Sequence, residues 1–271
     1  MNLSDTETVE KTLEDPDVHE HWKKEYRTQE NERFFELAFE KIVQELQLVD
    51  NMKVLDAGCG TCAHSIRLAR RGVSVLATDF SSSVLEMALK NLRKNGVEEK
   101  VELQREDLLS LSFKDGSIDR IVCWGVLMHI PDIATAIAEL SRVLNNGGIL
   151  VLSEGNRFSL DSRIMRILRK VLRRETAIFK NTLAGNEFWE KSPTGDLMTR
   201  QSDIQWIVKE FQTHGIRLKK HLPGQFTEMY TRIHWRPLNR VIHWFNRFWF
   251  DKIKSPSMSF GNILIFEKSS E

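Results

Sequence analysis

A short apolar segment followed by a glycine-containing turn and a helical pattern most constrains what this chain can fold into. Residues 53–57 have the composition of a buried strand, and the turn holds Gly58 and Gly60. Apolar residues at Ile66, Leu68 and Ala69 favour a helix after it. Glycine adopts positive φ without penalty, and a helix start leaves free N–H groups for a ligand. The pattern predicts a nucleotide-binding α/β unit.

Two kinds of ligand fit this turn. The dinucleotide fingerprint has three glycines, G-x-G-x-x-G, and its third position falls on Ala63, where alanine is tolerated. The number of glycines therefore does not separate a dinucleotide from S-adenosylmethionine. Asp56 lies directly before the turn and would repel a pyrophosphate, whereas it suits a cationic ligand with an amino group. This acid favours S-adenosylmethionine.

The stretch Asp56-Ala57-Gly58-Cys59-Gly60-Thr61 resembles the first motif of class I S-adenosylmethionine-dependent methyltransferases, in their small-molecule, type 11-like branch. Four further pieces resemble later motifs of the family in the same order: 75–79, a strand ending in the ribose-binding acid; 105–108, the turn that meets adenine; 113–122, the approach to the fourth strand; and 142–148, the turn before the fifth. The resemblance covers residues 50–155 and is specific in combination. Cys62 departs from it, because many members have glycine there, and the cysteine crowds the loop slightly.

Strand and helix patterns alternate through this region. Strands are predicted at 53–57, 73–78, 100–105, 119–124 and 148–153, and helices at 63–71, 82–94 and 132–144. Such alternation indicates a parallel sheet covered on both faces. The resemblance implies a Rossmann-like class I methyltransferase fold of the α/β class, with a mainly parallel seven-stranded sheet.

The resemblance also implies three parts of the chain. Residues 1–49 are expected to form a polar tail and a helical lid, with one helix from about Val18 to Leu48. Residues 50–155 form the S-adenosylmethionine-binding core. Residues 156–271 hold two lid insertions, the last helix and the closing strands. A helix is predicted at 162–174, a loop from there to about residue 200, a helix at 202–213, a further helix ending near Phe250, and strands at 216–222 and 261–266.

Several cofactor contacts follow from the resemblance. Ligands of parallel α/β sheets bind outside the carboxyl ends of the strands, where four predicted residues converge: Asp56, Asp79, Asp107 and Trp124. Asp79 can accept both ribose hydroxyls, and Asp107 the adenine amino group. The complete set expected to bind S-adenosylmethionine, with S-adenosylhomocysteine as product, is Tyr26, Asp56, Gly58, Gly60, Thr61, Asp79, Phe80, Asp107, Leu108 and Trp124. Trp22 and Tyr26 either form the lid or pack on the core.

Two residues are candidate catalytic groups. By resemblance the segment 124–131, WGVLMHIP, lies beside the reactive methyl group, and its His129 is a candidate general base because its pKa lies near working pH. Glu154, at the end of the fifth strand, is the second candidate. Methyl transfer is an in-line displacement, so the protein mainly aligns donor and acceptor. The reaction requires no metal, and Cys59-x-x-Cys62 is interpreted as small residues in the cofactor turn.

Composition limits the class of protein. The chain has 39 basic and 38 acidic residues, which does not indicate nucleic-acid binding. Its three cysteines lack a disulfide-framework spacing, which is typical of a reducing compartment. Neither a signal peptide nor an apolar run of transmembrane length is visible, so a soluble cytoplasmic protein is expected.

The two predicted insertions are rich in basic and aromatic residues. Residues 162–174 form a basic amphipathic helix, and 235–250 combine tryptophan and phenylalanine with arginine. This composition suits a glycan-type acceptor or peripheral membrane contact, although a core stripe with a solvated basic face is the plainer interpretation.

The sequence therefore predicts methyl transfer from S-adenosylmethionine to a small-molecule or glycan-type acceptor, at oxygen. Nitrogen or carbon acceptors, a non-catalytic cofactor-binding scaffold and a nicotinamide-dependent dehydrogenase are the alternatives.

Overall fold

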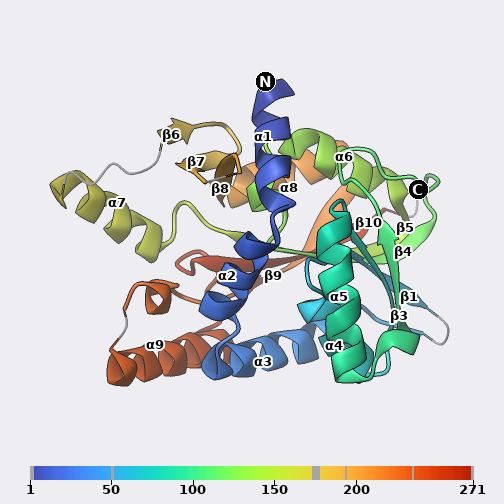
Figure 1. Ribbon diagram of the computed structural model, residues 1–271, viewed down its shortest axis with the longest axis horizontal. Coiled ribbons are helices and arrows are strands. Elements are labelled where there is room, and N and C mark those ends of the chain that lie inside the picture. The colour runs from blue at the N-terminus through green and yellow to red at the C-terminus, as the bar shows by residue number, and fades with distance from the viewer. Residues whose placement is uncertain (1–2, 50–51, 173–177, 193, 234, 270–271) are drawn as a thin grey trace.

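The computed structural model describes residues 3–49, 52–172, 178–192, 194–233 and 235–269. A seven-stranded sheet lies at its centre in the order β3-β2-β1-β4-β5-β10-β9 (Figure 1). The first five strands pair in parallel, and β10 runs antiparallel to β5 and β9. The strands are β1 (Lys53–Ala57), β2 (Ser74–Asp79), β3 (Val101–Arg105), β4 (Ile118–Trp124), β5 (Leu144–Gly155), β9 (Ile216–Pro223) and β10 (Gly261–Lys268). The predicted mainly parallel seven-stranded α/β sheet is confirmed.

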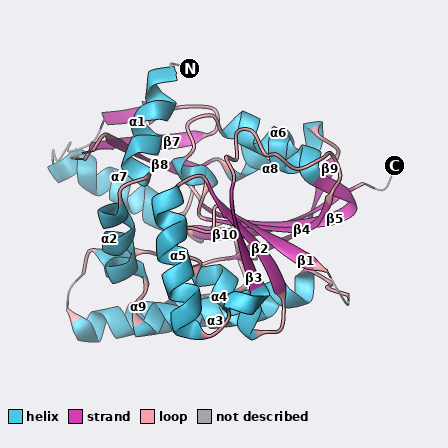
Figure 2. Ribbon diagram, turned by 45° about the vertical axis from the view of Figure 1, so that its right-hand side comes forward, coloured by secondary structure: helices cyan, strands magenta, loops and turns pink. Residues whose placement is uncertain are grey.

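Helices cover both faces of this sheet, as the alternation predicts (Figure 2). In β1, Val54 packs in the cluster that contains α3, α4 and α5, whereas its neighbour Leu55 packs in the cluster that contains α6 and α8. These helices are α3 (Gln29–Glu45), α4 (Ala63–Arg70), α5 (Ser82–Asn95), α6 (Ile133–Val143) and α8 (Ile204–Thr213). Because the strands are buried on both faces, only their ends are left to form a site.

The N-terminal region differs from its prediction. In place of a polar tail and one long helix there are α1 (Leu3–Leu13), α2 (Pro16–Tyr26) and then α3. The Thr28 side chain accepts a hydrogen bond from the backbone N–H of Asn31 and starts α3, so the long helix is divided. Val9 of α1 packs against Trp189 and Met198, which lie far along the chain. Such a partner gives no local signal, which is why the first residues resembled a tail.

The prediction of a loop between about residues 174 and 200 is wrong. The described part of this stretch forms a three-stranded antiparallel sheet of β6 (Ile178–Asn181), β7 (Gly185–Lys191) and β8 (Asp196–Ser202). A buried ion pair between Arg200 of β8 and Glu187 of β7, 2.9 Å apart, ties two of its strands together. Arg200 also donates to the carbonyls of Leu127, Ile130 and Pro131, so this small sheet fixes the segment that follows β4.

Two further helices lie at one end of the molecule, on the left of Figure 1. They are α7 (Leu160–Leu172) and α9 (Arg236–Phe248), and α9 continues into one turn of π-helix, Trp249–Ile253. Thr227 links them, because its hydroxyl donates to Asp161 of α7 (2.8 Å) and its backbone bonds to the Asn246 amide of α9. Both helices occur close to where the sequence predicts them.

Candidate active site

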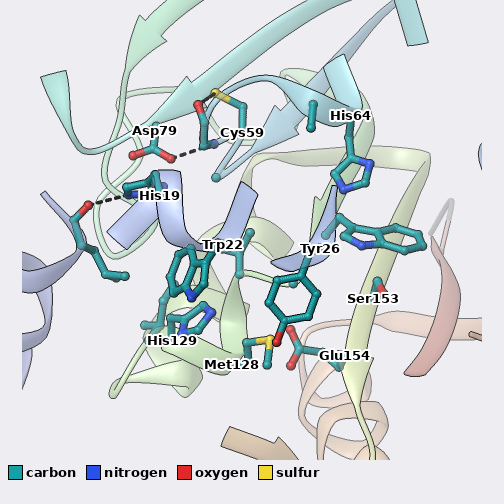
Figure 3. Close-up of a pocket in the computed structure, with 18 of the residues that line it drawn as sticks. His19, Trp22, Tyr26, Cys59, His64, Asp79, Met128, His129, Ser153 and Glu154 are labelled. Carbon is teal, nitrogen blue, oxygen red and sulfur yellow. Dashed lines mark hydrogen bonds between the residues drawn. The ribbon is translucent and has the colours of Figure 1, made fainter. Parts of the chain in front are cut away.

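A cavity of about 380 Å³ lies at the carboxyl ends of the parallel strands. Its wall comes from the turn after β1, from the ends of β2 to β5, from α1 and α2, and from residues near 225 and 260 (Figure 3). Of the residues predicted to bind a cofactor or take part in catalysis, the cavity is lined by Tyr26, Gly58, Gly60, Thr61, Asp79, Phe80, Asp107, Leu108, Trp124, His129 and Glu154. The fold therefore brings together eleven of the twelve predicted residues.

The turn after β1 has the shape that its glycines predict. Gly58 has φ +75° and Gly60 φ +53°. A Cβ at Gly58 would lie 2.6 Å from both Cγ atoms of Val126, so a larger residue there would have to displace this side chain. The N–H groups of Gly58 and Cys59 both donate to the carbonyl of Thr78 in β2, at 2.9 and 2.8 Å. These bonds fix the turn against the neighbouring strand.

Cys62 shows why glycine suits its position. It precedes α4 with φ +62°, a left-handed conformation in which a Cβ is crowded, and it is fully buried. Cys59 is buried as well, and both thiols are free. The predicted crowding of this loop thus has a definite origin in the backbone.

Asp79 joins the turn to the end of β2. One carboxylate oxygen accepts from the backbone N–H of Gly60 at 3.0 Å, and the other from that of Ser81 at 3.1 Å. Burial raises the pKa of this carboxyl, and its hydrogen bonds and nearby His19 oppose the rise. An ionised carboxylate has about four acceptor positions, so Asp79 keeps capacity for a ligand after these two bonds.

Asp56 is the predicted site residue that does not line the cavity. It is buried beneath the turn, where it accepts a hydrogen bond from the Ser65 hydroxyl of α4. Burial raises its pKa to about 6. Successive side chains of a strand point to opposite faces of the sheet. The Asp56 carboxyl points toward α4, so it stabilises the junction of strand, turn and helix.

The turn after β3 contributes two acids with different surroundings. Glu106 is buried and accepts from Ser112 and Gln104, whereas Asp107 is exposed and accepts from the backbone N–H of Leu109 at 2.8 Å. Leu108, which follows these two acids, is buried against the sheet. Asp107 thus faces solvent at the rim of the cavity with much of its acceptor capacity free.

Aromatic rings form much of the remaining wall. Trp124 packs with Phe35, Phe39 and His64, with ring centroids 5.2 to 6.1 Å apart. Trp22 of α2 stacks on His129, with centroids 4.9 Å apart and planes 26° apart. Tyr26 lies one helical turn after Trp22 and points into the cavity beside Met128 and Glu154 (Figure 3). Helix α2 therefore runs along the cavity and contributes three of its rings, those of His19, Trp22 and Tyr26.

His129 is neutral in this setting. Its Nδ1 donates to the carbonyl of Met198 at 2.9 Å, which leaves Nε2 as an acceptor. Burial lowers the pKa of His129 to about 4, and the bond to Met198 only partly opposes this. Such a weakly basic imidazole is poorly matched to proton abstraction at neutral pH.

Glu154 is better suited than His129 to accept a proton at neutral pH. Its Oε2 accepts from the Ser202 hydroxyl at 3.1 Å, while Oε1 is buried without a hydrogen bond of ordinary geometry to the described residues. Burial raises the pKa of Glu154 to about 7; Ser202, Arg200 and the nearby backbone oppose the rise. A carboxyl with one unpaired buried oxygen and a pKa near neutrality, facing a cavity, is arranged to accept a proton.

Two charged residues near Glu154 and His129 were not predicted from the sequence. Glu228 lines the cavity, and burial raises its pKa to about 7, with the charge of Asp161 contributing. Its charge is the largest cause of the raised pKa of Tyr26. Arg200 holds the segment that carries His129. Both lie in stretches without a recognisable motif, so no signal in the sequence pointed to them.

The described residues contain no group of three or more histidine, cysteine, aspartate or glutamate side chains arranged to hold a metal ion. None of the helices they form combines the length and apolar character that crossing a bilayer requires.

Comparison with known proteins agrees with the predicted resemblance. Residues 55–152 match a family model described as a methyltransferase domain. Similar sequences include a methyltransferase, GfsG, from Streptomyces halstedii (34% identity over 116 residues, 42% of this chain and 42% of that protein) and demethylmenaquinone methyltransferase from Lactiplantibacillus plantarum (32% over 140 residues, 51% and 52%). Sterol 24-C-methyltransferase from Gibberella zeae is 27% identical over 114 residues, 42% of this chain and 30% of that protein. The chain thus spans about half, or less, of the length of these relatives.

Solved structures share the fold at low identity. Magnesium protoporphyrin IX methyltransferase from Synechocystis PCC 6803, with bound S-adenosylhomocysteine, superposes with a TM-score of 0.65 at 16% identity, over 97% of this chain and 100% of that one. A [4+2]-cyclase, SpnF, has a TM-score of 0.57 at 18% identity, over 87% and 81%. These structures confirm the predicted Rossmann-like fold.

Proposed function

We propose that this chain, whose residues 55–152 match a methyltransferase domain, transfers a methyl group from S-adenosylmethionine to a small-molecule acceptor. The observation that carries the proposal is one cavity with two ends. The glycine turn, Asp79 and Asp107 form the donor end, and Tyr26, Glu154 and Glu228 form the acceptor end. A carboxylate held by backbone N–H groups at one end and an unpaired buried carboxyl at the other suit donor binding and proton removal.

The donor end fits S-adenosylmethionine. Asp79 retains acceptor positions for the ribose hydroxyls after binding the turn, and Asp107 has capacity for the adenine amino group. At Gly60 no atom lies within 4 Å of the position of a Cβ, so the backbone there is open to a ligand. The ring of Trp124 is placed to pack on the adenosine or face the sulfonium.

At the acceptor end, Glu154 is our candidate general base. S-adenosylmethionine supplies an activated methyl group, so the chain needs to align the acceptor and take its proton. Oε1 of Glu154 is the unpaired acceptor for that proton, and Ser202 orients the carboxyl through Oε2. His129, neutral and hydrogen-bonded to Met198, serves to hold Trp22 and the cavity wall.

The acceptor we propose is a molecule with an apolar ring system that carries a hydroxyl group. The aromatic wall of Trp22, Tyr26 and Trp124 and the base Glu154 support it. Two relatives are named for demethylmenaquinone and for a sterol. A glycan would also stack on these rings, and methylation at carbon or nitrogen needs the same alignment, so these acceptors remain alternatives.

A second candidate function has a specific observation in its favour. The same fold occurs in a [4+2]-cyclase, so it supports chemistry other than methyl transfer. Donor binding without turnover would then indicate a protein that keeps the cofactor fold for another purpose.

Calorimetric titration with S-adenosylmethionine, S-adenosylhomocysteine and NADH tests the donor. We expect binding of the first two, weaker binding of both in Asp79→Ala, and no binding of NADH. Binding of NADH alone would overturn the proposal. Mass spectrometry of hydroxylated quinones, sterols and sugars incubated with the protein and S-adenosylmethionine then tests the transfer. A gain of one methyl group supports it, and donor binding with every acceptor unchanged favours the second candidate.

A further inference from the structure

Helix α9 has its amphipathic pattern reversed. The side chains that it buries are polar, His243 and Asn246. Its exposed side chains include Leu238, Val241, Trp244 and Phe248, and the rings of the last two stack with centroids 5.4 Å apart. A surface helix of a globular protein normally buries its apolar side, so this side is built for a partner outside the chain.

Helix α7 shows the same reversal over its described side chains. Asp161 and Ser162 are buried, and Asp161 accepts a hydrogen bond from Thr227. The exposed side chains at Leu160, Ile164, Ile167 and Leu168 are apolar. Two helices with inverted patterns are harder to explain as chance than one.

The two apolar sides belong to one end of the molecule. Besides the link through Thr227, the backbone N–H of Leu160 donates to the carbonyl of Met258, 3.2 Å away, in the loop that follows α9. We define the α7–α9 face as Leu160, Ile164, Ile167, Leu168, Leu238, Val241, Trp244, Phe248, Ile253 and Met258. Each of these side chains is between 37% and 64% exposed.

Exposed basic residues accompany this face. They are Arg163, Arg166, Arg236, Arg240, Lys252 and Lys254. In residues 158–168 and 235–258 the only exposed acid is Asp251, which pairs with Lys252 at 2.8 Å. The face therefore combines apolar side chains that can enter a lipid interface with positive charge that complements anionic headgroups.

We propose that the α7–α9 face docks on the surface of a membrane that contains anionic lipids. Both helices would lie in the interface plane, with Trp244 at headgroup depth. A second copy of the chain is a less suitable occupant, because a symmetric contact would bring two basic faces together. The inference goes beyond the proposed methyl transfer and does not depend on it.

Docking there would place the cavity beside the lipid. Gln225, Glu228 and Phe260 line the acceptor end, and they flank Thr227 and Met258, which belong to the links between the two helices. An acceptor dissolved in the membrane would then be close to the wall formed by these segments.

Flotation with vesicles of phosphatidylcholine alone, or with a third of phosphatidylglycerol, tests the proposal. We expect the intact chain to float with the anionic vesicles and at least about tenfold less with neutral ones or in high salt. Trp244→Ser/Phe248→Ser should reduce binding by at least about tenfold. The matched control is Ile178→Ser/Leu183→Ser, which removes two exposed apolar side chains from the β6–β7 hairpin and should bind as the wild type does.

Two further variants test how much the positive charge of the α7–α9 face contributes to membrane binding. Arg236→Glu/Arg240→Glu should weaken binding by roughly fivefold or more for each residue, whereas Arg93→Glu/Lys94→Glu on α5 should have no such effect. All four variants should titrate S-adenosylmethionine as the wild type does, which separates this test from that of the proposed function. Wild-type protein that fails to float, or equal loss in test and control variants, overturns the proposal. So does a dimer in light scattering that Trp244→Ser/Phe248→Ser dissociates, because a second copy would then cover the face.

Discussion

The donor end of the cavity takes its side chains from turns that follow consecutive strands, whereas the acceptor end takes them from segments far apart in the chain. Asp79 and the glycine turn lie within about twenty residues of each other and are joined by backbone hydrogen bonds. Tyr26, Glu154 and Glu228 meet only because α2, β5 and the segment after β9 fold onto one another.

The carboxyl groups at the two ends of the cavity also differ in their hydrogen bonds. At the donor end both oxygens of Asp79 accept from backbone N–H groups, which hold the carboxyl in place and oppose the rise in its pKa that burial causes. At the acceptor end Glu154 has one unpaired oxygen, and burial raises its pKa to about 7. The carboxyl at the donor end is thus fixed in position, whereas the carboxyl at the acceptor end can gain or lose a proton near neutral pH.

The largest expected effect is on turnover at the acceptor end. Glu154→Gln should lower the turnover number by about a hundredfold or more, the usual contribution of a general base, and leave donor affinity unchanged. His129→Asn, at the neighbouring cavity wall, serves as the comparison and should have a smaller effect. Single-turnover assays with the identified acceptor measure both. If the histidine variant proved the more impaired, the two roles would have to be exchanged.

The same substitution should change stability with pH. Because burial raises the pKa of Glu154 from 4.5 to about 7, the folded protein holds a proton there that the unfolded chain loses, and the carboxyl costs stability as pH rises through this interval. Glu154→Gln should therefore gain up to about 3 kcal/mol over the wild type above pH 7, and little near pH 4.5. Urea unfolding at several pH values measures the gain; a difference independent of pH would mean that Glu154 is not buried as a neutral acid.

At the donor end, Asp79→Ala should weaken S-adenosylhomocysteine binding by about 1–3 kcal/mol, because hydrogen bonds to a charged, buried carboxylate are lost. Asp107→Ala is the control at the exposed rim and should cost less binding free energy. Calorimetry gives both values. Equal losses of affinity in the two variants would mean that the buried Asp79 contributes no more to binding than the exposed Asp107.

The smallest expected effect concerns the turn itself. Both Gly58→Ala and Gly60→Ala place a Cβ at positive φ, but only the first collides with Val126. Gly58→Ala should therefore be less stable than Gly60→Ala by about 1–2 kcal/mol, the range for a crowded buried contact. Thermal unfolding compares them, and adding Val126→Ala to Gly58→Ala should recover the difference. Without recovery, the cost must come from the backbone alone.

Sequence by itself determined the central sheet and most of the donor end. Alternating strand and helix patterns place Asp79, Asp107 and Trp124 at strand ends, and a parallel sheet brings such ends to one edge whatever surrounds them. The glycines are predictable for the same reason, since positive φ and a close contact are local requirements. Local rules of this kind act over a few residues and can be recognised in a linear chain.

Only the tertiary structure decided the rest. Asp56 faces Ser65 beneath the turn and not the cavity, because the partner of a buried carboxyl depends on which helix packs against the strand. Whether Glu154 or His129 suits proton removal depends on how deeply each is buried and on its hydrogen bond to Ser202 or Met198, residues that are far along the chain. The small sheet around Arg200 and the reversed faces of α7 and α9 likewise follow from contacts between distant segments, and the desolvation and pairing that set their energies exist only once those segments meet.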